Sequence, residues 1–321
     1  MSISSDATQR TQTWIDQHGA RVTRTPMLLD DGIPATCPAV DVAMTTLAVT
    51  GATGAVGGLT ARLLVDAGYA PRLLVRDPSR APDLGLDVAS CSYADVSAAT
   101  SVLRGVDVLF MVSGHESADR VAEHRTFLES AVTAGVGHVV YTSFIGASDT
   151  ARFSLARDHG ATEDLLRESG MAWTFLRDNF YAEVIPRFSD TDGVIRGPAG
   201  SGRVAVVSQR DVAAVAATVL ADPASHRAAT YDLTGPEALS LTEAARRLTA
   251  ATGRPYSFRD ETLDEARASR AHYGAPAWQV DAWISTYTAI REGELAAVSD
   301  DVPRLLGRPA ARFEDAAAAA R

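Results

Sequence analysis

The segment TLAVTGATGAVG, residues 46–57, carries the most structural information in this chain. Residues 46–50 are apolar enough for a short strand, and glycines follow at Gly51, Gly54 and Gly57. After a strand, the first such glycine permits a tight turn, the second leaves room for a pyrophosphate, and the third lets the next helix pack closely. The free N–H groups of that helix then face the phosphates. The segment therefore predicts a dinucleotide-binding loop.

The residues after this loop alternate between strand-like and helix-like patterns. Apolar residues at helical spacing follow the glycines up to Gly68; two predicted strands come next, and three further helix–strand pairs follow them. The predicted strands are residues 46–50, 72–75, 86–91, 106–112, 138–143 and 172–176, and the predicted helices after the first are 98–103, 121–134 and 161–169. This alternation is typical of an α/β fold with a doubly wound, parallel Rossmann-type sheet.

The chain divides into three predicted parts. Residues 1–43 lack sustained periodicity and form an N-terminal arm on which we do not expect the fold to depend. Residues 44–180 form the predicted NADP-binding Rossmann core. Residues 181–321 form a smaller α+β substrate lobe, partly interleaved with the core, in which Ser240 and Glu243 make a capping-box pattern.

The composition excludes several chemistries. All 30 basic residues are arginine, so a lysine Schiff base, a phosphate-binding loop lysine and a Tyr–Lys proton relay are excluded. The formal charge of −10 makes nucleic acids and anionic membranes poor partners. Cys37 and Cys91 provide no disulfide scaffold, and the histidines lack metal-ligand companions, so we expect no metal. No apolar signal core follows the first residues, and we expect a cytoplasmic protein.

Arg76 indicates which dinucleotide binds. It directly follows the second predicted strand, where a carboxylate would bind a free ribose 2′-OH and an arginine accommodates a 2′-phosphate. The guanidinium group also stacks on adenine. We therefore expect NADPH in preference to NADH. The alternative is a solvated surface charge paired with Asp77.

Five stretches, residues 49–58, 141–145, 159–163, 176–181 and 231–235, resemble the NmrA-like, atypical branch of the short-chain dehydrogenase/reductase superfamily. The likeness is greatest to the bacterial type-2 NAD(P)H:quinone oxidoreductases. The likeness extends from Met44 to about Phe313. It implies that residues 50–57 and Arg76 contact the cofactor phosphates. The implied cofactor-binding residues are Gly51, Thr53, Gly54, Ala55, Val56, Gly57 and Arg76, with Ser113, Thr142, Ser143 and Phe144 at the nicotinamide end. Ser92 replaces the family's aspartate after the third strand.

The catalytic positions differ from those of ordinary short-chain dehydrogenases. His159 and Glu163 occupy the positions of the Tyr-x-x-x-Lys pair, which the quinone reductases of this branch also lack. His159 is a candidate proton donor or a packing residue at a helix start. Asn179 is a candidate ligand of a carbonyl oxygen or a turn residue. Tyr181, with Phe144 and Phe180, forms either a slot for an aromatic acceptor or part of the core.

Two function classes remain. The first is an NADPH-dependent oxidoreductase that passes hydride to a quinone or similar conjugated carbonyl, with His159, Asn179 and Tyr181 as the catalytic candidates. The second is an NmrA-like NADP(H)-sensing regulatory protein without turnover, which the missing Tyr–Lys pair favours. The isoflavone-reductase-like branch needs a catalytic lysine and is set aside. The expected partner is a small aromatic or quinone-like substrate, and we allow for a homodimer.

Overall fold

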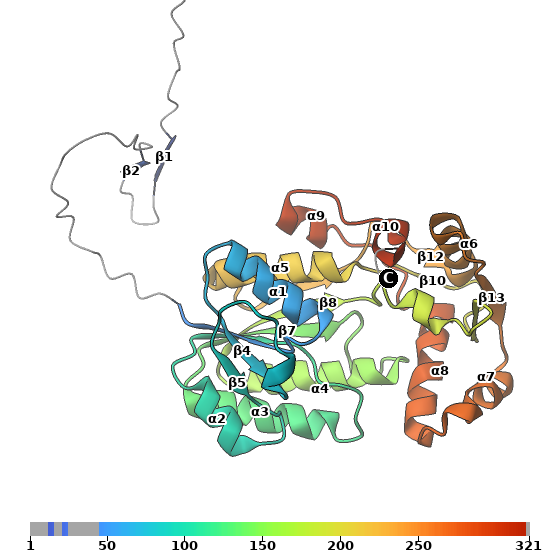
Figure 1. The fold of residues 1–321 in the computed structure, drawn as a ribbon, viewed down its shortest axis with the longest axis horizontal. Helices are drawn as coiled ribbons and strands as arrows, with labels where there is room; N and C mark the ends of the chain where they lie inside the picture. The colour runs from blue at the N-terminus through green and yellow to red at the C-terminus, as the bar shows by residue number, and fades with distance from the viewer. Residues whose placement is uncertain (1–11, 16–20, 25–44, 319–321) are drawn as a thin grey trace, which may run out of the picture. The chain divides into compact units, whose positions relative to one another are not determined.

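The computed structural model describes residues 12–15, 21–24 and 45–318, in two units that meet in sequence at residues 43 and 44 (Figure 1). In the first unit, β1 (Gln12–Ile15) and β2 (Arg21–Arg24) pair antiparallel, a hairpin that the sequence did not predict. The rest of the expected N-terminal arm lies outside the described residues. Residues 44–321 form the second, compact unit.

A seven-stranded parallel sheet lies at the centre of the second unit, which confirms the predicted Rossmann-type fold. The strand order is β11-β8-β7-β6-β3-β4-β5, so the chain winds outward from β3 in both directions. Ligands bind such sheets beyond the carboxyl ends of the strands where this reversal occurs. The strands are β3 (Leu47–Thr50), β4 (Arg72–Val75), β5 (Val88–Ser90), β6 (Val108–Met111), β7 (His138–Phe144), β8 (Ala172–Asp178) and β11 (Ala229–Leu233).

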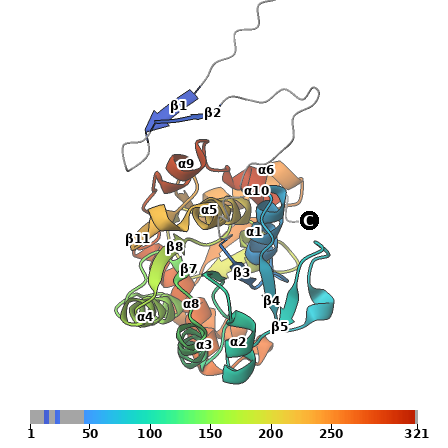
Figure 2. The same ribbon diagram turned by 90° about the vertical axis from the view of Figure 1, so that its left-hand side faces the viewer.

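Helices cover both faces of this sheet because successive side chains of each strand point to opposite faces. In β3, Val49 packs with the helices α1 and α5, whereas Ala48 packs with α2, α3 and α4. Figure 2 shows the two helical layers on either side of the strands. The layers consist of α1 (Ala55–Asp66), α5 (Gln209–Ala221) and α9 (Asp301–Leu306) on one side and of α2 (Val96–Leu103), α3 (Arg120–Ala134) and α4 (Ser154–Glu168) on the other.

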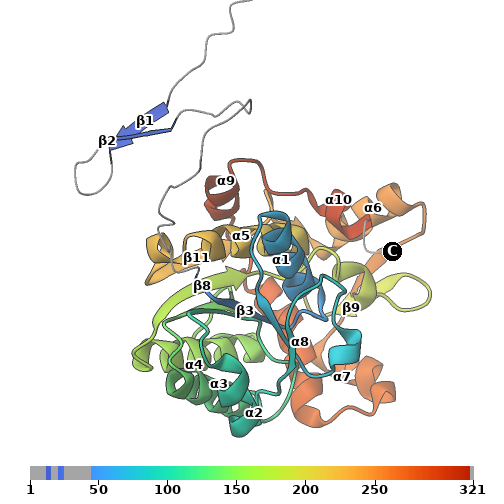
Figure 3. The same cartoon turned by 60° about the vertical axis from the view of Figure 1, so that its left-hand side comes forward.

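The C-terminal segments build a smaller layer that adjoins the sheet, and β11 and α5 return to the sheet itself (Figure 3). Ser240 and Glu243 form the predicted capping box at the start of α6. The smaller layer contains two pairs of strands: β9 (Val194–Gly197) pairs with β13 (Ser257–Asp260), and β10 (Arg203–Val204) pairs with β12 (Leu239–Ser240). The helices of this layer are α6 (Leu241–Thr252), α7 (Leu263–Arg270), α8 (Ala277–Arg291) and α10 (Phe313–Ala318). Short 3-10 turns are η1 (Pro78–Arg80), which follows β4, and η2 (Ile185–Phe188), η3 (Pro223–His226) and η4 (Ala271–Tyr273).

The largest departure from the predicted elements is α4, which starts at Ser154 rather than at residue 161. Gly160 is an unfavourable residue inside a helix, which is why the prediction began after it. In the structure, a Cβ on Gly160 would lie 2.9 Å from the backbone of Ser148. The glycine thus allows helix and loop to approach closely, and the longer helix carries His159 on its buried face.

No helix in the described part of the chain has both the length and the apolar character needed to cross a bilayer.

Candidate active site

A pocket of about 380 Å³ opens at the carboxyl ends of β3, β4 and β6. Of the predicted cofactor-binding residues, the loop and strand ends contribute Gly51, Thr53, Gly54, Arg76 and Ser113 to its wall. Its other lining residues are Thr50, Leu74, Val75, Cys91, Ser92, Tyr93, Val112, Gly114, His115 and Glu123. The site thus forms at the reversal of strand order, where a dinucleotide is expected.

The glycines of the loop are needed for its shape. Gly51 has φ of +65°, a conformation that favours glycine, and its carbonyl oxygen accepts a hydrogen bond from the N–H of Gly54 at 2.9 Å. A Cβ on Gly57 would lie 2.4 Å from that same oxygen. Ala55, Val56 and Gly57 form the first turn of α1, whose exposed N–H groups suit the pyrophosphate of a dinucleotide.

Arg76 is available to a ligand. Its side chain is exposed at the pocket wall, and the Asp77 carboxylate instead accepts from the N–H and hydroxyl of Ser79 at 3.0 and 2.7 Å. These two bonds hold the pKa of Asp77 below its ordinary value. Among the described residues, no carboxylate pairs with the guanidinium group of Arg76. The structure therefore does not contain the Arg76–Asp77 ion pair that formed the alternative interpretation.

Tyr93 forms the floor of this pocket and was not assigned a role from sequence. Its hydroxyl donates to the carbonyl oxygen of Val112 at 2.6 Å and lies 2.7 Å from the Thr50 hydroxyl. The ring stacks on Phe127 with centroids 4.2 Å apart. Burial raises its pKa above the ordinary tyrosine value, so the phenol stays neutral. Tyr93 therefore joins the ends of β3 and β6 at the wall of the pocket.

Of the four residues expected at the nicotinamide end, Ser113 lines the cofactor pocket and the other three lie behind or beside it. Thr142 accepts a hydrogen bond from the N–H of Ser113 at 2.8 Å and so holds the loop after β6. Ser143 is buried and donates to Glu163 at 2.6 Å, and Phe144 lines a neighbouring pocket. None of the three is among the described residues that line the cofactor pocket. Adjacent strand residues point to opposite faces, which separates Thr142 from Ser143.

A second pocket of about 210 Å³ shares Ser113 and Gly114 with the first. It contains all three residues predicted for the chemistry, His159, Asn179 and Tyr181. The remaining wall consists of Glu116, Arg120, Phe144, Phe153, Leu155, Asp178, Phe180 and Val184. The geometry therefore brings the predicted catalytic residues beside the predicted cofactor site.

His159 lies in a buried hydrogen-bond network. Arg120 Nη2 donates to its Nε2 at 3.1 Å, since a guanidinium group cannot accept. Its Nδ1 therefore carries the proton and donates to the Tyr141 hydroxyl at 3.0 Å. Burial, followed by the charge of Arg120, holds the pKa of His159 well below its ordinary value. The imidazole stays neutral near pH 7, which argues against an imidazolium acid.

Asn179 uses its side chain to join two loops. Its amide oxygen accepts from the N–H of Phe180 at 2.8 Å, and its Nδ2 donates to the carbonyl oxygen of Leu295 at 3.1 Å. These contacts are those of the turn residue that formed the alternative interpretation. The side chain shapes the loop after β8, which places Phe180 and Tyr181 in the pocket wall.

Glu163, at the position of the superfamily's lysine, sits in a buried ion-pair network. It pairs with Arg177 at 2.6 Å and with Arg167 at 2.8 Å, and it also accepts from Ser143. Arg167 lies one helical turn after Glu163 on the same face of α4. Since its oxygens are used within α4, β7 and β8, we regard Glu163 as a structural residue.

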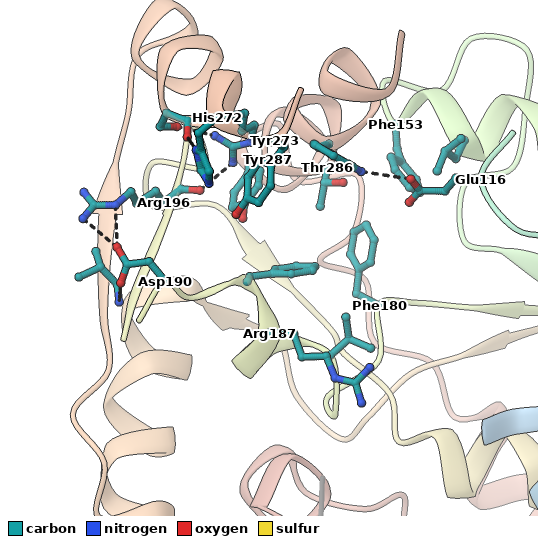
Figure 4. Close-up of a pocket in the computed structure, with 17 residues that line it drawn as sticks. Glu116, Phe153, Phe180, Arg187, Asp190, Arg196, His272, Tyr273, Thr286 and Tyr287 are labelled. Atoms are coloured by element: carbon teal, nitrogen blue, oxygen red, sulfur yellow. Dashed lines mark hydrogen bonds and ion pairs between the residues drawn. The ribbon is translucent and has the colours of Figure 1, made fainter. Parts of the chain in front are cut away.

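A third and larger pocket, about 620 Å³, adjoins the second and shares Glu116, Phe153 and Phe180 with it. Figure 4 shows Phe180, Tyr273 and Tyr287 around its apolar interior. Helix α8 contributes Trp283 and Tyr287 to this wall. Trp283 Nε1 donates to Glu116 at 3.1 Å, which links α8 to the loop after β6.

Sequence reasoning missed Arg120 and Asp178. Arg120 begins α3 and is buried, and its Nε has no hydrogen-bond partner in the part of the chain that the structure describes. No local spacing marks it, because its contact with His159 spans 39 residues. Asp178 had a usable signal, since it is a carboxylate placed at the end of a predicted apolar strand.

Known proteins resemble the chain over most of its length. The model of an NAD(P)H-binding family matches residues 51–223. An NAD(P)H azoreductase from Xenophilus azovorans is 35% identical over 84% of this chain and 96% of its own. Quinone oxidoreductase 2 from Escherichia coli is 32% identical, over 82% of this chain and 94% of its own.

Among solved structures, an NADPH-dependent quinone oxidoreductase from Escherichia coli, complexed with NADPH, superposes with a TM-score of 0.78. It is 31% identical, and the alignment covers 85% of this chain and 99% of that one. The resemblance inferred from the motifs is thereby confirmed.

Proposed function

This chain belongs to the NAD(P)H-binding family and is an NAD(P)H-dependent oxidoreductase; we propose that it uses NADPH to reduce a quinone or a similar flat, conjugated acceptor. One observation carries the proposal. The pocket at the glycine loop continues, through Ser113 and Gly114, into a pocket walled by aromatic rings. Such continuity lets a dinucleotide and a planar acceptor lie against one another.

The residues present suit NADPH. Gly51 and Gly57 leave the backbone bare at the first turn of α1, where a pyrophosphate has N–H donors. Arg76 presents an unpaired guanidinium group to a 2′-phosphate. When bound, the reduced nicotinamide supplies a hydride. The residues of this chain would hold the nicotinamide ring at Ser113 and exclude water around it.

The acceptor site has an aromatic wall. The rings of Phe144, Phe153 and Phe180 pack against one another with centroids 4.9 to 5.2 Å apart and interplanar angles of 57° to 62°. An aromatic wall of this kind favours a conjugated ring ligand over an aliphatic one. The adjoining pocket of about 620 Å³ provides room for further rings. We therefore expect acceptors of two or more rings to bind better than a single benzoquinone ring.

We assign a different role to each of the three residues that the sequence suggested for catalysis. Tyr181 and His159 face the acceptor pocket, where Tyr181 contacts the acceptor and neutral His159 fixes Arg120 beside it. Asn179 positions the loop that carries Phe180 and Tyr181. Since the imidazole of His159 is neutral, the proton that completes the reduction needs another source.

Purified protein mixed with NADPH and a panel of benzoquinone, naphthoquinone and an azo dye tests the proposal. We expect NADPH consumption that depends on the acceptor, fastest for the larger rings. The alternative is an NADP(H)-sensing regulator, which the missing Tyr–Lys pair favours. Tight NADPH binding in calorimetry without consumption by any acceptor would support that alternative.

A further inference from the structure

Asp178 is a buried carboxyl group at the junction of the two pockets. It is the last residue of β8, in register with Phe144 of β7, and only 6% exposed. It lines the pocket that shares Ser113 and Gly114 with the cofactor site. A carboxyl group at this place lies beside the site where we propose that hydride arrives.

Burial favours the neutral form of Asp178, whereas two of its neighbours favour the charged form. The Tyr181 hydroxyl donates to Oδ2 of Asp178, and the nearby cation Arg120 forms its ion pair with Asp158, at 3.7 Å. Burial raises the pKa of Asp178 to about 7, against smaller lowering effects of Tyr181 and Arg120. The other titratable groups around this pair are Tyr141 on β7, His159 on α4 and Glu183 after Tyr181.

We propose that Asp178 is the proton donor to the reduced acceptor, and that Tyr181 positions its carboxyl group. This inference rests on the proposed function. Reduction of a quinone needs one hydride, which NADPH supplies, and one proton. The O–H bond of the Asp178 carboxyl breaks as an O–H bond forms on the acceptor oxygen, and the resulting carboxylate regains its proton from solvent. Phenolic oxygens have pKa values near 10, so this transfer is downhill.

His159, the donor expected from sequence, does not compete for this role. Its Nε2 accepts from Arg120, and its one proton is donated to Tyr141. Both nitrogens are thus used inside the protein. Tyr181 donates to Oδ2 of Asp178, so the proton of the neutral carboxyl group lies on Oδ1, and the residue lines the pocket.

Steady-state kinetics at saturating NADPH and quinone test the role of Asp178. Asp178→Asn is expected to lower kcat by about 10²- to 10⁴-fold, the usual effect of losing general acid catalysis. Wild-type kcat is expected to fall as pH rises through about 7, whereas the variant is expected to show no such fall. Asp264→Asn, at an exposed carboxylate on α7, is the matched control and should behave as wild type.

Tyr181→Phe separates positioning from packing. The phenyl ring keeps the shape, but Asp178 loses the hydrogen bond that lowers its pKa. The fall of kcat with pH should therefore move to higher pH. A change in kcat with the fall at an unaltered pH would show that Tyr181 does not act through Asp178.

An infrared titration of the cofactor-free protein gives a readout without turnover and shows whether the variants fold. The carbonyl stretch of a protonated carboxylic acid should disappear near pH 7, and this change should be missing in Asp178→Asn. The role of Asp178 is overturned if an active wild type and Asp178→Asn share kcat and pH profile, or if no such band titrates. If the wild type reduces no acceptor, the proposed function fails, and the role of Asp178 with it, whatever the infrared result.

Discussion

Replacing Arg76 by alanine tests which cofactor the site selects. Arg76 is exposed at the wall of the cofactor pocket, and the carboxylate of Asp77 next to it is bound by Ser79. The guanidinium group therefore gives up no internal ion pair when it binds a phosphate. Such a charge-assisted contact contributes about 1.5–3 kcal/mol.

This range sets the size of the expected effect. Arg76→Ala should weaken NADPH binding by about 10- to 150-fold and leave NADH binding within about twofold. Arg80→Ala is the control, because Arg80 is also an exposed arginine of the same connection but lies in η1 and outside the pocket wall. It should leave both affinities nearly unchanged.

Isothermal titration calorimetry of the wild type and both variants with NADPH and NADH measures these affinities. Equal losses for the two cofactors in Arg76→Ala would show that Arg76 does not bind the 2′-phosphate. If Arg80→Ala lost as much NADPH affinity as Arg76→Ala, the effect would come from the overall positive charge of the loop after β4 and not from a specific contact of Arg76.

Three further changes are expected to have measurable effects. Gly57→Ala should abolish dinucleotide binding in calorimetry, because its Cβ would lie 2.4 Å from a backbone oxygen, whereas Gly137→Ala, with its nearest contact at 3.4 Å, should bind normally. Asp178→Asn should gain stability relative to wild type as pH rises from about 5 to about 7, by ~2 kcal/mol in urea unfolding, because only the folded wild type holds its proton over this range; equal pH dependence would contradict the raised pKa. Phe180→Ala should raise the quinone KM more than it lowers kcat, and an unchanged KM would place the acceptor elsewhere.

The core of the fold was predictable because its signals are local. The period of the apolar residues and the glycine spacing located β4 at Arg72–Val75 exactly as expected, and the same signals placed α1 after the glycine loop. β4 is buried within the sheet and α1 is packed on it, so the periodic pattern of apolar residues in both elements is strong. The strands of the C-terminal layer are as short as two residues, so each one carries little periodic pattern.

The site was predictable only in part, because its decisive contacts are long-range. The glycine loop and Arg76 follow from motifs and lie together in one pocket. The neutral state of His159 depends on Arg120, which is 39 residues away in sequence. The helix predicted at residues 161–169 starts at Ser154 in the structure and therefore includes His159. The pKa of Asp178 depends on burial, which only the assembled sheet and loops reveal.

The central claim is that this chain transfers hydride from NADPH to a flat conjugated acceptor, and NADPH consumption measures it most directly. The near-ultraviolet absorbance of NADPH is followed with purified protein and naphthoquinone, and Gly57→Ala serves as the control that lacks the cofactor cradle. We predict saturable loss of NADPH absorbance that requires both protein and quinone and is absent in Gly57→Ala. Tight binding of NADPH with no loss of absorbance for naphthoquinone, benzoquinone or an azo dye would contradict the account.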